Sequence, residues 1–233
     1  MLHPGDLERI RTADGSTTLR HRRLGVLYRS AQGARIESGH VFIRGAMAKA
    51  PPPWGVLELG FGEARNFRGA VEAALEMGAA LHYCAVDHEP IPPGHVEGEG
   101  LGAALARAAL AEVRRTGATA ILEQGGVRLV LHPRDWKDAA LEKERFGAVF
   151  HDPFAPSVNP EAWTESCFAW SRAAMAPRGI LATYSAAGHV RRAMARAGLF
   201  VAVAAGPGRK REITFASPSE EALGGARIKY RPC

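Results

Sequence analysis

The chain has 233 residues, of which 46% are hydrophobic and 23% charged, and these values are typical of a globular protein large enough to bury a two-sided core. The chain lacks an apolar run long enough for a membrane span, and residues 1–15 lack the pattern of a signal peptide, so we expect a cytosolic protein. Three widely spaced cysteines argue against a disulfide framework or a metal site, and the net charge of +6 favours an acidic partner.

The first fifty residues end at Pro51-Pro52-Pro53, a stretch that can continue neither a helix nor a sheet ladder. Upstream of it, the turn signal Asp14-Gly15-Ser16 and the apolar run His40 to Ile43 predict a small extension that contains a hairpin. We therefore expect an N-terminal extension over residues 1–50 and a main domain over residues 51–233.

From residue 54 onward, apolar runs typical of strands alternate with segments typical of helices, which predicts a parallel sheet covered on both faces. The last two apolar runs are joined through Gly206-Pro207-Gly208-Arg209-Lys210, a connection too short for a helix, so they should pair antiparallel. This α/β arrangement, mostly parallel with an antiparallel hairpin at its end, is typical of class I S-adenosyl-L-methionine (AdoMet) methyltransferases with a Rossmann-like sheet. The expected strands are 54–59, 80–86, 127–131, 148–151, 179–184, 199–204 and 212–216, and the expected helices are 66–77, 100–115, 136–145, 161–175 and 186–197.

A glycine-containing loop follows the first of these strands, with the sequence Glu58-Leu59-Gly60-Phe61-Gly62. Glycines after a buried strand let the backbone turn tightly and approach a ligand at the carboxyl edge of the sheet. Arg65 stands where a dinucleotide fingerprint needs its third glycine, which weakens NAD binding. The pattern is similar to the first methyltransferase motif, although a simple turn would also explain it.

Two acidic side chains follow the next strands. Asp87 ends the run 80–86, where a carboxylate can accept hydrogen bonds from both ribose hydroxyls, and Glu89 is a competing candidate. Asp135 follows the run 127–131, where it could accept from an adenine amino group or cap the next helix.

The segment Asp152-Pro153-Phe154 follows the fourth strand and resembles the D/N-P-P-Y/F loop of methyltransferases that act on amines. An amine must be neutral and oriented when it attacks a methyl group, and must later lose a proton, so a carboxylate at this position suits the chemistry. Phe154 could stack on a planar base or lie beside a cation. The alternative is that Asp152 is a turn residue and Phe154 belongs to the core.

Several motifs together resemble the methyltransferase half of the bifunctional tRNA enzyme MnmC and its stand-alone relatives. They are Asp152 to Pro156 with Asn159-Pro160 and Trp163-Thr164, Glu58 to Gly62 with Asn66-Phe67, Asp87 with Pro90, Ala182 to Ser185 with Val190 to Arg192, Gly208 to Glu212, and Tyr28-x-Ser30 with Val41-Phe42. The resemblance implies transfer of a methyl group from AdoMet to the 5-aminomethyl nitrogen of a wobble uridine in the anticodon arm of tRNA.

The resemblance also implies roles for individual residues. Asp152 and Phe154 would be catalytic, with Asp152 orienting or deprotonating the amine and Phe154 shaping the base pocket. A chain of 233 residues has no room for a flavin oxidoreductase half, so another enzyme would have to supply the aminomethyl group. The cofactor-binding residues would be Glu58, Gly60, Phe61, Gly62, Asn66, Asp87, Asp135 and Asp152.

Basic residues concentrate in two segments, residues 9–44 with eight arginines and residues 189–212. If the substrate is tRNA, phosphate contacts should supply most of the affinity. Arg209, Lys210 and Arg211 are the favoured RNA contacts, and Arg191 and Arg192 could either contact RNA or pair locally. Solvated basic faces without a ligand would explain the same charges.

Two other functions fit the sequence. One is methyl transfer to a small-molecule amine or another RNA position, and the other is RNA binding without catalysis on the same fold. A steep loss of affinity with salt would favour an RNA substrate over a small amine.

Overall fold

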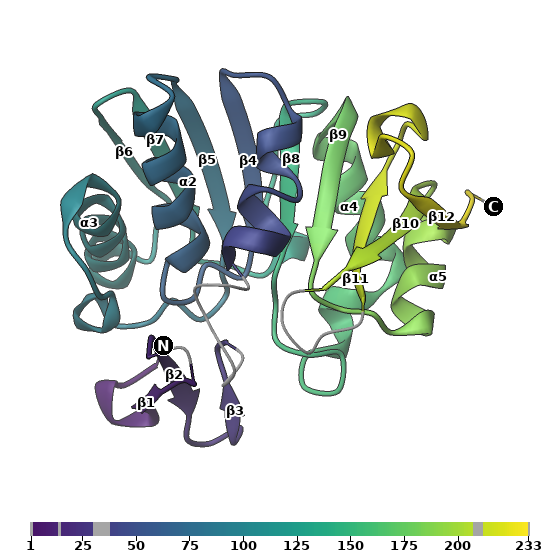
Figure 1. The fold of residues 1–233 in the computed structure, drawn as a ribbon. Helices are drawn as coiled ribbons and strands as arrows, with labels where there is room; N and C mark the ends of the chain where they lie inside the picture. Colours follow the sequence, from purple (N-terminus) through teal and green to yellow (C-terminus); the bar gives the residue numbers. More distant parts are fainter. Residues whose placement is uncertain (1, 14, 30–37, 207–211, 233) are drawn as a thin grey trace.

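The computed structural model describes residues 2–13, 15–29, 38–206 and 212–232, and these form a nine-stranded sheet with helices on both faces, next to a three-stranded sheet (Figure 1). The large sheet has the order β12-β10-β11-β9-β8-β4-β5-β7-β6. Its strands are β4 (Trp54–Leu59), β5 (Leu81–Val86), β6 (Ala120–Gln124), β7 (Val127–His132), β8 (Phe146–His151), β9 (Met175–Thr183), β10 (Phe200–Ala205), β11 (Glu212–Ser217) and β12 (Arg227–Tyr230). The α-helices are α2 (Arg65–Glu76), α3 (Gly100–Thr116), α4 (Glu165–Ala174) and α5 (Gly188–Arg196).

The five central strands β7, β5, β4, β8 and β9 are parallel, and antiparallel strands flank them on both sides. The predicted hairpin is confirmed, because β10 pairs antiparallel with β11. The chain therefore has the fold of class I AdoMet methyltransferases, as the sequence predicted. None of the helices in the described residues is long and apolar enough to cross a membrane.

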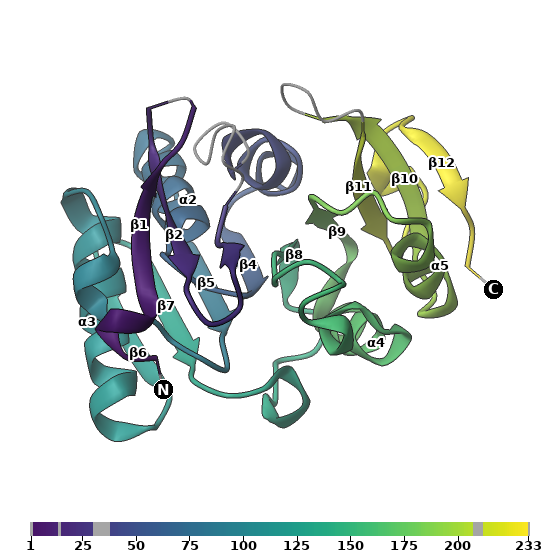
Figure 2. The same ribbon diagram turned by 90° about the horizontal axis from the view of Figure 1, so that it is seen from below.

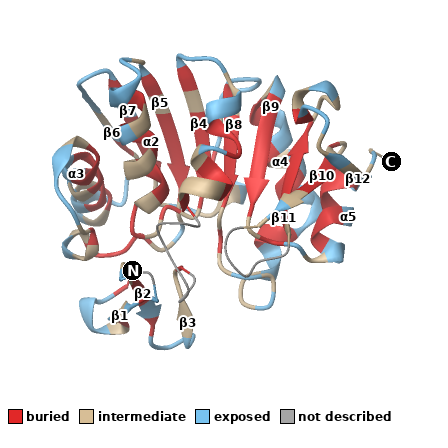
Figure 3. Ribbon diagram, in the orientation of Figure 1, coloured by how far each residue is buried: buried red, intermediate tan, exposed pale blue. Residues whose placement is uncertain are grey.

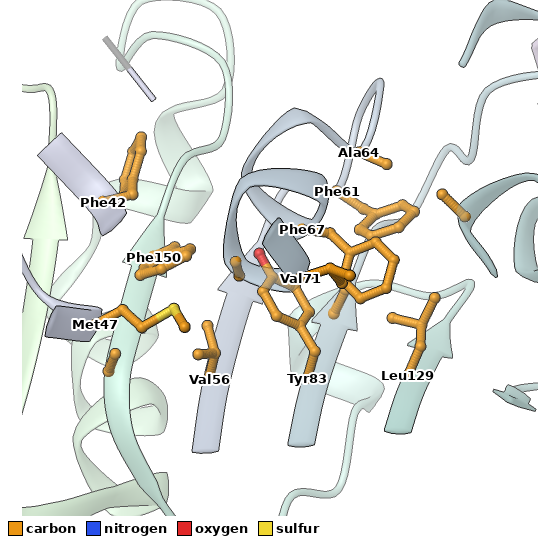
Figure 4. Packing of buried hydrophobic residues seen from close by; sticks show 14 of the residues in the cluster. Phe42, Met47, Val56, Phe61, Ala64, Phe67, Val71, Tyr83, Leu129 and Phe150 are labelled. Carbon is orange, nitrogen blue, oxygen red and sulfur yellow. The ribbon is translucent and has the colours of Figure 1, made fainter. Parts of the chain in front are cut away.

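The central strands are buried on both faces, because helices cover the sheet on each side (Figure 3). Successive residues of a strand point to opposite faces and so enter different cores. Val56 packs in the hydrophobic cluster on the side of α2 and α3, and the next residue, Leu57, packs in the cluster on the side of α4 and α5. Figure 4 shows the first cluster, where Phe67 from α2 meets Tyr83 from β5, with ring centroids 5.0 Å apart. Two cores thus hold the carboxyl ends of the parallel strands in place.

The three-stranded sheet consists of β1 (Leu7–Arg11), β2 (Thr17–His21) and β3 (Val26–Leu27) and lies below the carboxyl ends of β4 and β5 (Figures 1 and 2). The predicted hairpin turn is present, with the Thr12 amide donating to the Ser16 carbonyl over 2.8 Å. Leu7 and Leu19 belong to the same hydrophobic cluster as Val56. A division of the chain at residue 50 stays a prediction.

The sequence suggested that the run His40 to Ile43 belongs to a hairpin. In the structure it is instead part of a short π-helical segment, η2 (Ser38–Ile43). Val41 and Phe42 are both fully buried, and Phe42 lies 5.3 Å from Phe150 between ring centroids. Consecutive residues of a strand point to opposite faces, whereas this segment covers the sheet from one side only. A helical turn lets both side chains reach the same core.

The predicted helix over residues 136–145 is wrong. A single 3₁₀ turn, η5 (Trp136–Asp138), is followed by irregular chain. The amides of Glu144 and Arg145 donate to the carbonyls of Ala173 and Ala174 at the end of α4, which replaces the hydrogen bonds that a helix would make. Residues 142–145 are also exposed, so a helix there would have no apolar face to bury.

Two strands of the large sheet were missed by sequence reasoning. β6 pairs with β7 across Gly125-Gly126, whose φ angles are 58° and 76°. A Gly-Gly pair between two apolar runs is a hairpin signal, so this strand could have been found. β12 is short and half exposed, and its sequence carries no comparable signal.

Candidate active site

The loop between β4 and α2 depends on glycine at two positions. Gly60 has φ of 91°, and a Cβ there would lie 2.7 Å from the carbonyl oxygen of Asp152. Gly62 has φ of 50°, and its Cβ would lie 3.1 Å from the ring of Tyr28. The loop therefore packs closely against the end of β8 and against Tyr28, and side chains at these two positions would prevent that approach.

Asp87 at the end of β5 braces this loop. One carboxylate oxygen accepts the amide of Gly62 at 2.9 Å, and the other accepts the amide of Glu89 at 3.0 Å. Each oxygen still has a lone pair for another donor, so the side chain can orient a ligand with hydroxyl groups.

A cavity of about 430 Å³ lies at the carboxyl ends of β4, β5, β7 and β8, where α/β sheets of this kind bind ligands. Its volume falls in the range of small-molecule sites, roughly 300–1,000 Å³. Apolar walls come from Leu59, Val86 and Trp136. Five of the eight predicted cofactor-binding residues line this cavity, namely Gly60, Gly62, Asp87, Asp135 and Asp152.

A second cavity of about 370 Å³ adjoins the first at Asp152 and Phe154, which line both. Its own lining includes Val26, Leu27 and Tyr184. Both cavities share the lining residues Tyr28, Arg29, Asp152, Pro153, Phe154 and Val158. The loop after β8, together with Tyr28 and Arg29, therefore forms lining that the two cavities share, and we call it the shared wall.

Phe154 is half-buried in this wall, and its ring meets the ring of Tyr28 edge-on with centroids 4.9 Å apart. The backbone around it is fastened by two side chains. Trp163 donates its indole N–H to the carbonyl of Phe154 at 2.8 Å, and the Tyr184 hydroxyl donates to the carbonyl of Pro153 at 2.8 Å. Phe154 is thus presented to both cavities on a rigid loop and is not a core residue.

Asp152 is the centre of a buried polar network. Its side chain is only 5% exposed, forms an ion pair with Arg29 and accepts the Asn66 amide at 2.7 Å. The same amide group donates to Glu58 at 2.7 Å, and the Tyr83 hydroxyl donates to Glu58 at 2.8 Å. These contacts fix the direction in which the Asp152 carboxylate points.

Glu58 is fully buried, and burial together with the negative charge of Asp152 raises its pKa to about 8. At neutral pH it is therefore mostly protonated, and its hydrogen bonds to Asn66 and Tyr83 are structural. Neither Glu58 nor Asn66 lines the cavity, although both were expected to contact the cofactor. Asn66 holds the Asp152 carboxylate from the interior of the protein, and Glu58 holds Asn66.

The structure corrects two other expectations. Phe61 was expected at the cofactor, but its side chain is 1% exposed and packs against Phe67 in the core, because the tight turn at Gly60 directs it inward. Arg191 was offered as an RNA contact. It is 2% exposed and donates to Thr214 at 2.9 Å and to Glu212 at 2.8 Å, so it pairs locally.

The remaining predicted residues are accounted for as follows. Arg192 is exposed on α5. Arg209, Lys210 and Arg211 lie outside the described residues. Asp135 accepts the amide of Lys137 at 3.0 Å, so it caps η5 as well as lining the cavity, and the two roles suggested by the sequence are compatible.

Sequence reasoning missed Arg29. Arg29 is the variable residue of the Tyr28-x-Ser30 motif, and nothing in that pattern shows that the arginine side chain is buried against Asp152. Its position follows from packing of the segment after β3 against the end of β8.

Comparison with known proteins agrees with this geometry. A family model described as S-adenosyl-L-methionine-dependent methyltransferase matches residues 102–219, about half of the chain. The chain belongs to this family. AdoMet is accordingly the cofactor of this methyltransferase, and the larger cavity fits it in volume and lining, since the glycine loop and the strand-end carboxylates Asp87 and Asp135 border it.

Individual curated proteins show which members of the family this chain is similar to. The chain is 32% identical over 213 residues to the tRNA 5-methylaminomethyl-2-thiouridine biosynthesis bifunctional protein MnmC of Chromobacterium violaceum, which covers 82% of this chain and 32% of that protein. The MnmC of Ectopseudomonas mendocina is 34% identical over 211 residues, with the same coverage. The chain thus spans about a third of the length of these curated relatives.

Solved structures agree. The crystal structure of MNMC2 from Aquifex aeolicus matches with a TM-score of 0.75 and 27% identity, covering 97% of this chain and 72% of that one. Spermidine synthase from Thermotoga maritima, at 14% identity and a TM-score of 0.57, shares the fold alone. The predicted resemblance to the methyltransferase domain of MnmC is confirmed.

Proposed function

We propose that this methyltransferase methylates the 5-aminomethyl nitrogen of the wobble uridine in tRNA and so forms 5-methylaminomethyluridine or its 2-thio form. The observation that carries the proposal is the second cavity, which adjoins the cofactor cavity across Asp152 and Phe154. A donor in one cavity and an acceptor in the other would meet beside the carboxylate that both cavities share. The relatives named MnmC support the choice of nucleoside.

In the cofactor cavity, different residues would contact different parts of AdoMet. Bound AdoMet supplies an electrophilic methyl group on a sulfonium sulfur. Asp87 would accept hydrogen bonds from the ribose hydroxyls, Gly60 and Gly62 would make room for the methionine end, and Asp135 would lie near the adenine. Leu59, Val86 and Trp136 would exclude water from the apolar parts of the ligand.

On the acceptor side, Tyr28, Phe154 and Tyr184 provide aromatic surface for a planar base. Asp152 would accept a hydrogen bond from the aminomethyl nitrogen and hold its lone pair in line for attack, which is the positioning that this kind of transfer needs. After transfer, the same carboxylate would take the proton from the methylated nitrogen or pass it to water.

Exposed cations would hold the anticodon arm by its phosphates, as is usual for RNA-binding proteins. Arg192, Arg20 and Arg22 are exposed, and the unplaced residues Arg209, Lys210 and Arg211 stay proposed contacts. We expect the reaction in the cytoplasm, on tRNA that already carries the aminomethyl group.

The test is to incubate the purified protein with radiolabelled AdoMet and tRNA from a strain that lacks this methylation, and then to identify the labelled nucleoside. We expect label in 5-methylaminomethyluridine or its 2-thio form. Label in another nucleoside would contradict the proposed acceptor. Absence of label, with AdoMet binding intact, would point to a small-molecule amine or to RNA binding without catalysis.

A further inference from the structure

A buried arginine is part of the shared wall of the two cavities. The Arg29 side chain is 6% exposed, forms an ion pair with Asp152 and lies 5.8 Å from the centroid of the Phe42 ring. Its backbone amide donates to the Thr18 hydroxyl at 3.0 Å, which ties this segment to β2. Arg29 therefore places a fixed positive charge beside the carboxylate that the acceptor amine would meet.

The charges of the described residues around Asp152 nearly cancel. Arg29 offsets Asp152 directly. Behind the wall, Glu58 has its pKa raised to about 8 by burial and by the charge of Asp152, and is mostly neutral at pH 7. Burial also raises the pKa values of Tyr28 and Tyr83, so both hydroxyls stay neutral.

Two other titratable groups near the Phe154 loop contact residues other than Asp152. The Tyr184 hydroxyl donates to the Pro153 carbonyl, and the His21 ring lies beyond Phe154, 6.4 Å away between centroids. The remaining charged or titratable residues line the cofactor cavity, and they are Glu63, Asp87, His88, Glu89, Arg134, Asp135 and Glu161.

This balance matters because a primary amine can enter as a neutral base or as an ammonium ion. An uncompensated buried carboxylate favours the cationic form of a neighbour, whereas a paired one does not. The ammonium ion has no lone pair and cannot react. A second cation would also be repelled by Arg29 and by the positively charged sulfonium of the methyl donor.

We propose that Arg29 is a positioning residue that makes the acceptor site select the neutral amine, by neutralising Asp152 without removing its ability to accept a hydrogen bond. The inference rests on the proposed function, because it requires an amine acceptor. The nitrogen lone pair forms the new N–C bond while the C–S bond of the donor breaks and leaves its electron pair on sulfur. The nitrogen then carries the positive charge and loses one proton to Asp152 or to water.

The test compares the pH dependence of kcat/KM in wild type, Arg29→Met and Arg29→Lys, with an anticodon stem-loop RNA that carries 5-aminomethyluridine. In Arg29→Met the unpaired carboxylate favours the ammonium ion, so the midpoint of the profile should move upward by about one pH unit, equivalent to a tenfold preference. Arg29→Lys keeps the charge and should keep the midpoint. A purely structural role would lower the rate and leave the midpoint unchanged, and that result would overturn the inference.

Binding gives a second readout that does not need turnover. At pH 6, Arg29→Met should bind the aminomethyl RNA about tenfold more tightly relative to the same RNA with plain uridine, whereas wild type should show little such preference. An equal preference in both proteins would contradict the inference. Circular dichroism and thermal unfolding report whether each variant is folded, because Arg29 also lines the cofactor cavity. Arg29→Gln, which keeps donors without charge, replaces Arg29→Met if that variant does not fold.

The two proposals fail in different ways. Wild type that methylates no aminomethyl RNA at any pH would overturn the proposed function, and this inference with it. Wild-type turnover together with an unmoved midpoint in the uncharged variants would overturn the inference alone.

Discussion

The two cavities that meet at Asp152 are built in different ways. The cofactor cavity is formed at the carboxyl ends of consecutive parallel strands, and its polar contacts come from a glycine loop and from carboxylates that follow β5 and β7. The acceptor cavity is assembled from distant parts of the chain, with Val26 and Leu27 from β3 and Tyr184 from the end of β9. The first arrangement follows from the fold, and the second would select the acceptor under the proposed function.

The strongest way to break this comparison is to change the wall that both cavities share. Asp152→Ala removes the group that would orient the amine and accept its proton, and we expect methyl transfer to fall about a hundredfold or more, the usual scale for a positioned acid-base group. AdoMet affinity should change little, because the other cavity residues remain. Turnover close to wild type, measured with labelled AdoMet, would overturn the assignment.

A change confined to the cofactor side should affect only that side. Asp87→Ala removes the expected ribose acceptor and the brace on the Gly62 amide, so the Kd for AdoMet should rise about thirtyfold, in line with the loss of hydrogen bonds to a charged group. Isothermal titration calorimetry measures this. Binding of RNA in the absence of AdoMet should stay unchanged.

The matched control for that change is Asp138→Ala, which alters an exposed acid in η5 and should leave the Kd for AdoMet as it is. Equal effects of the two substitutions would show that Asp87 does not contact the cofactor.

A change confined to the acceptor cavity should weaken RNA binding and leave AdoMet binding unchanged. Tyr184→Leu removes an aromatic surface that lines only the acceptor cavity, and since stacking on a base contributes roughly 1–3 kcal/mol, KM for the RNA should rise about tenfold. The Kd for AdoMet should not change. Tyr184→Phe keeps the ring and loses only the hydrogen bond to Pro153, so a KM as high as that of Tyr184→Leu would contradict a stacking role.

The buried Glu58 carboxyl group should make the free energy of unfolding depend on pH. An unfolded chain releases the proton of Glu58 near its ordinary pKa of 4.5, whereas the folded chain keeps it to about 8. The folded state therefore binds one more proton between these values, and the free energy of unfolding falls as pH rises through this window, on the order of 1 kcal/mol per pH unit.

Glu58→Gln removes this proton and keeps the shape of the side chain. Urea unfolding at pH 5.5 and 7.0 should show a smaller loss of stability in Glu58→Gln than in wild type. Identical slopes for the two proteins would mean that Glu58 is ionised in the folded state.

Sequence reasoning succeeded where local pattern and local structure agree. β4 was predicted with the bounds that the structure has, and Gly60, Gly62, Asp87 and Asp152 were placed at the sheet edge where they meet in one cavity. It failed where tertiary contacts override the local preference. Residues 136–145 look helical, but the amides of Glu144 and Arg145 are taken by the end of α4.

Burial was the other quantity that the pattern did not show. Phe61 lies between two glycines of a ligand loop, yet its side chain turns into the core. Arg191 and Arg192 are adjacent and chemically identical, but a helix places them about 100° apart, so that one is buried against Glu212 and the other is exposed.

The sequence alone determined the alternating α/β order, the antiparallel ending and the strand-end residues of the cofactor cavity, because the side-chain periods and the glycine positions that specify them are local. Only the tertiary structure decided that Arg29, from the segment after β3, pairs with Asp152 after β8, and that Glu58 and Asn66 support this carboxylate from behind. Such contacts join residues 86 or more positions apart, or depend on which side of a strand is covered, and no period in the sequence records them.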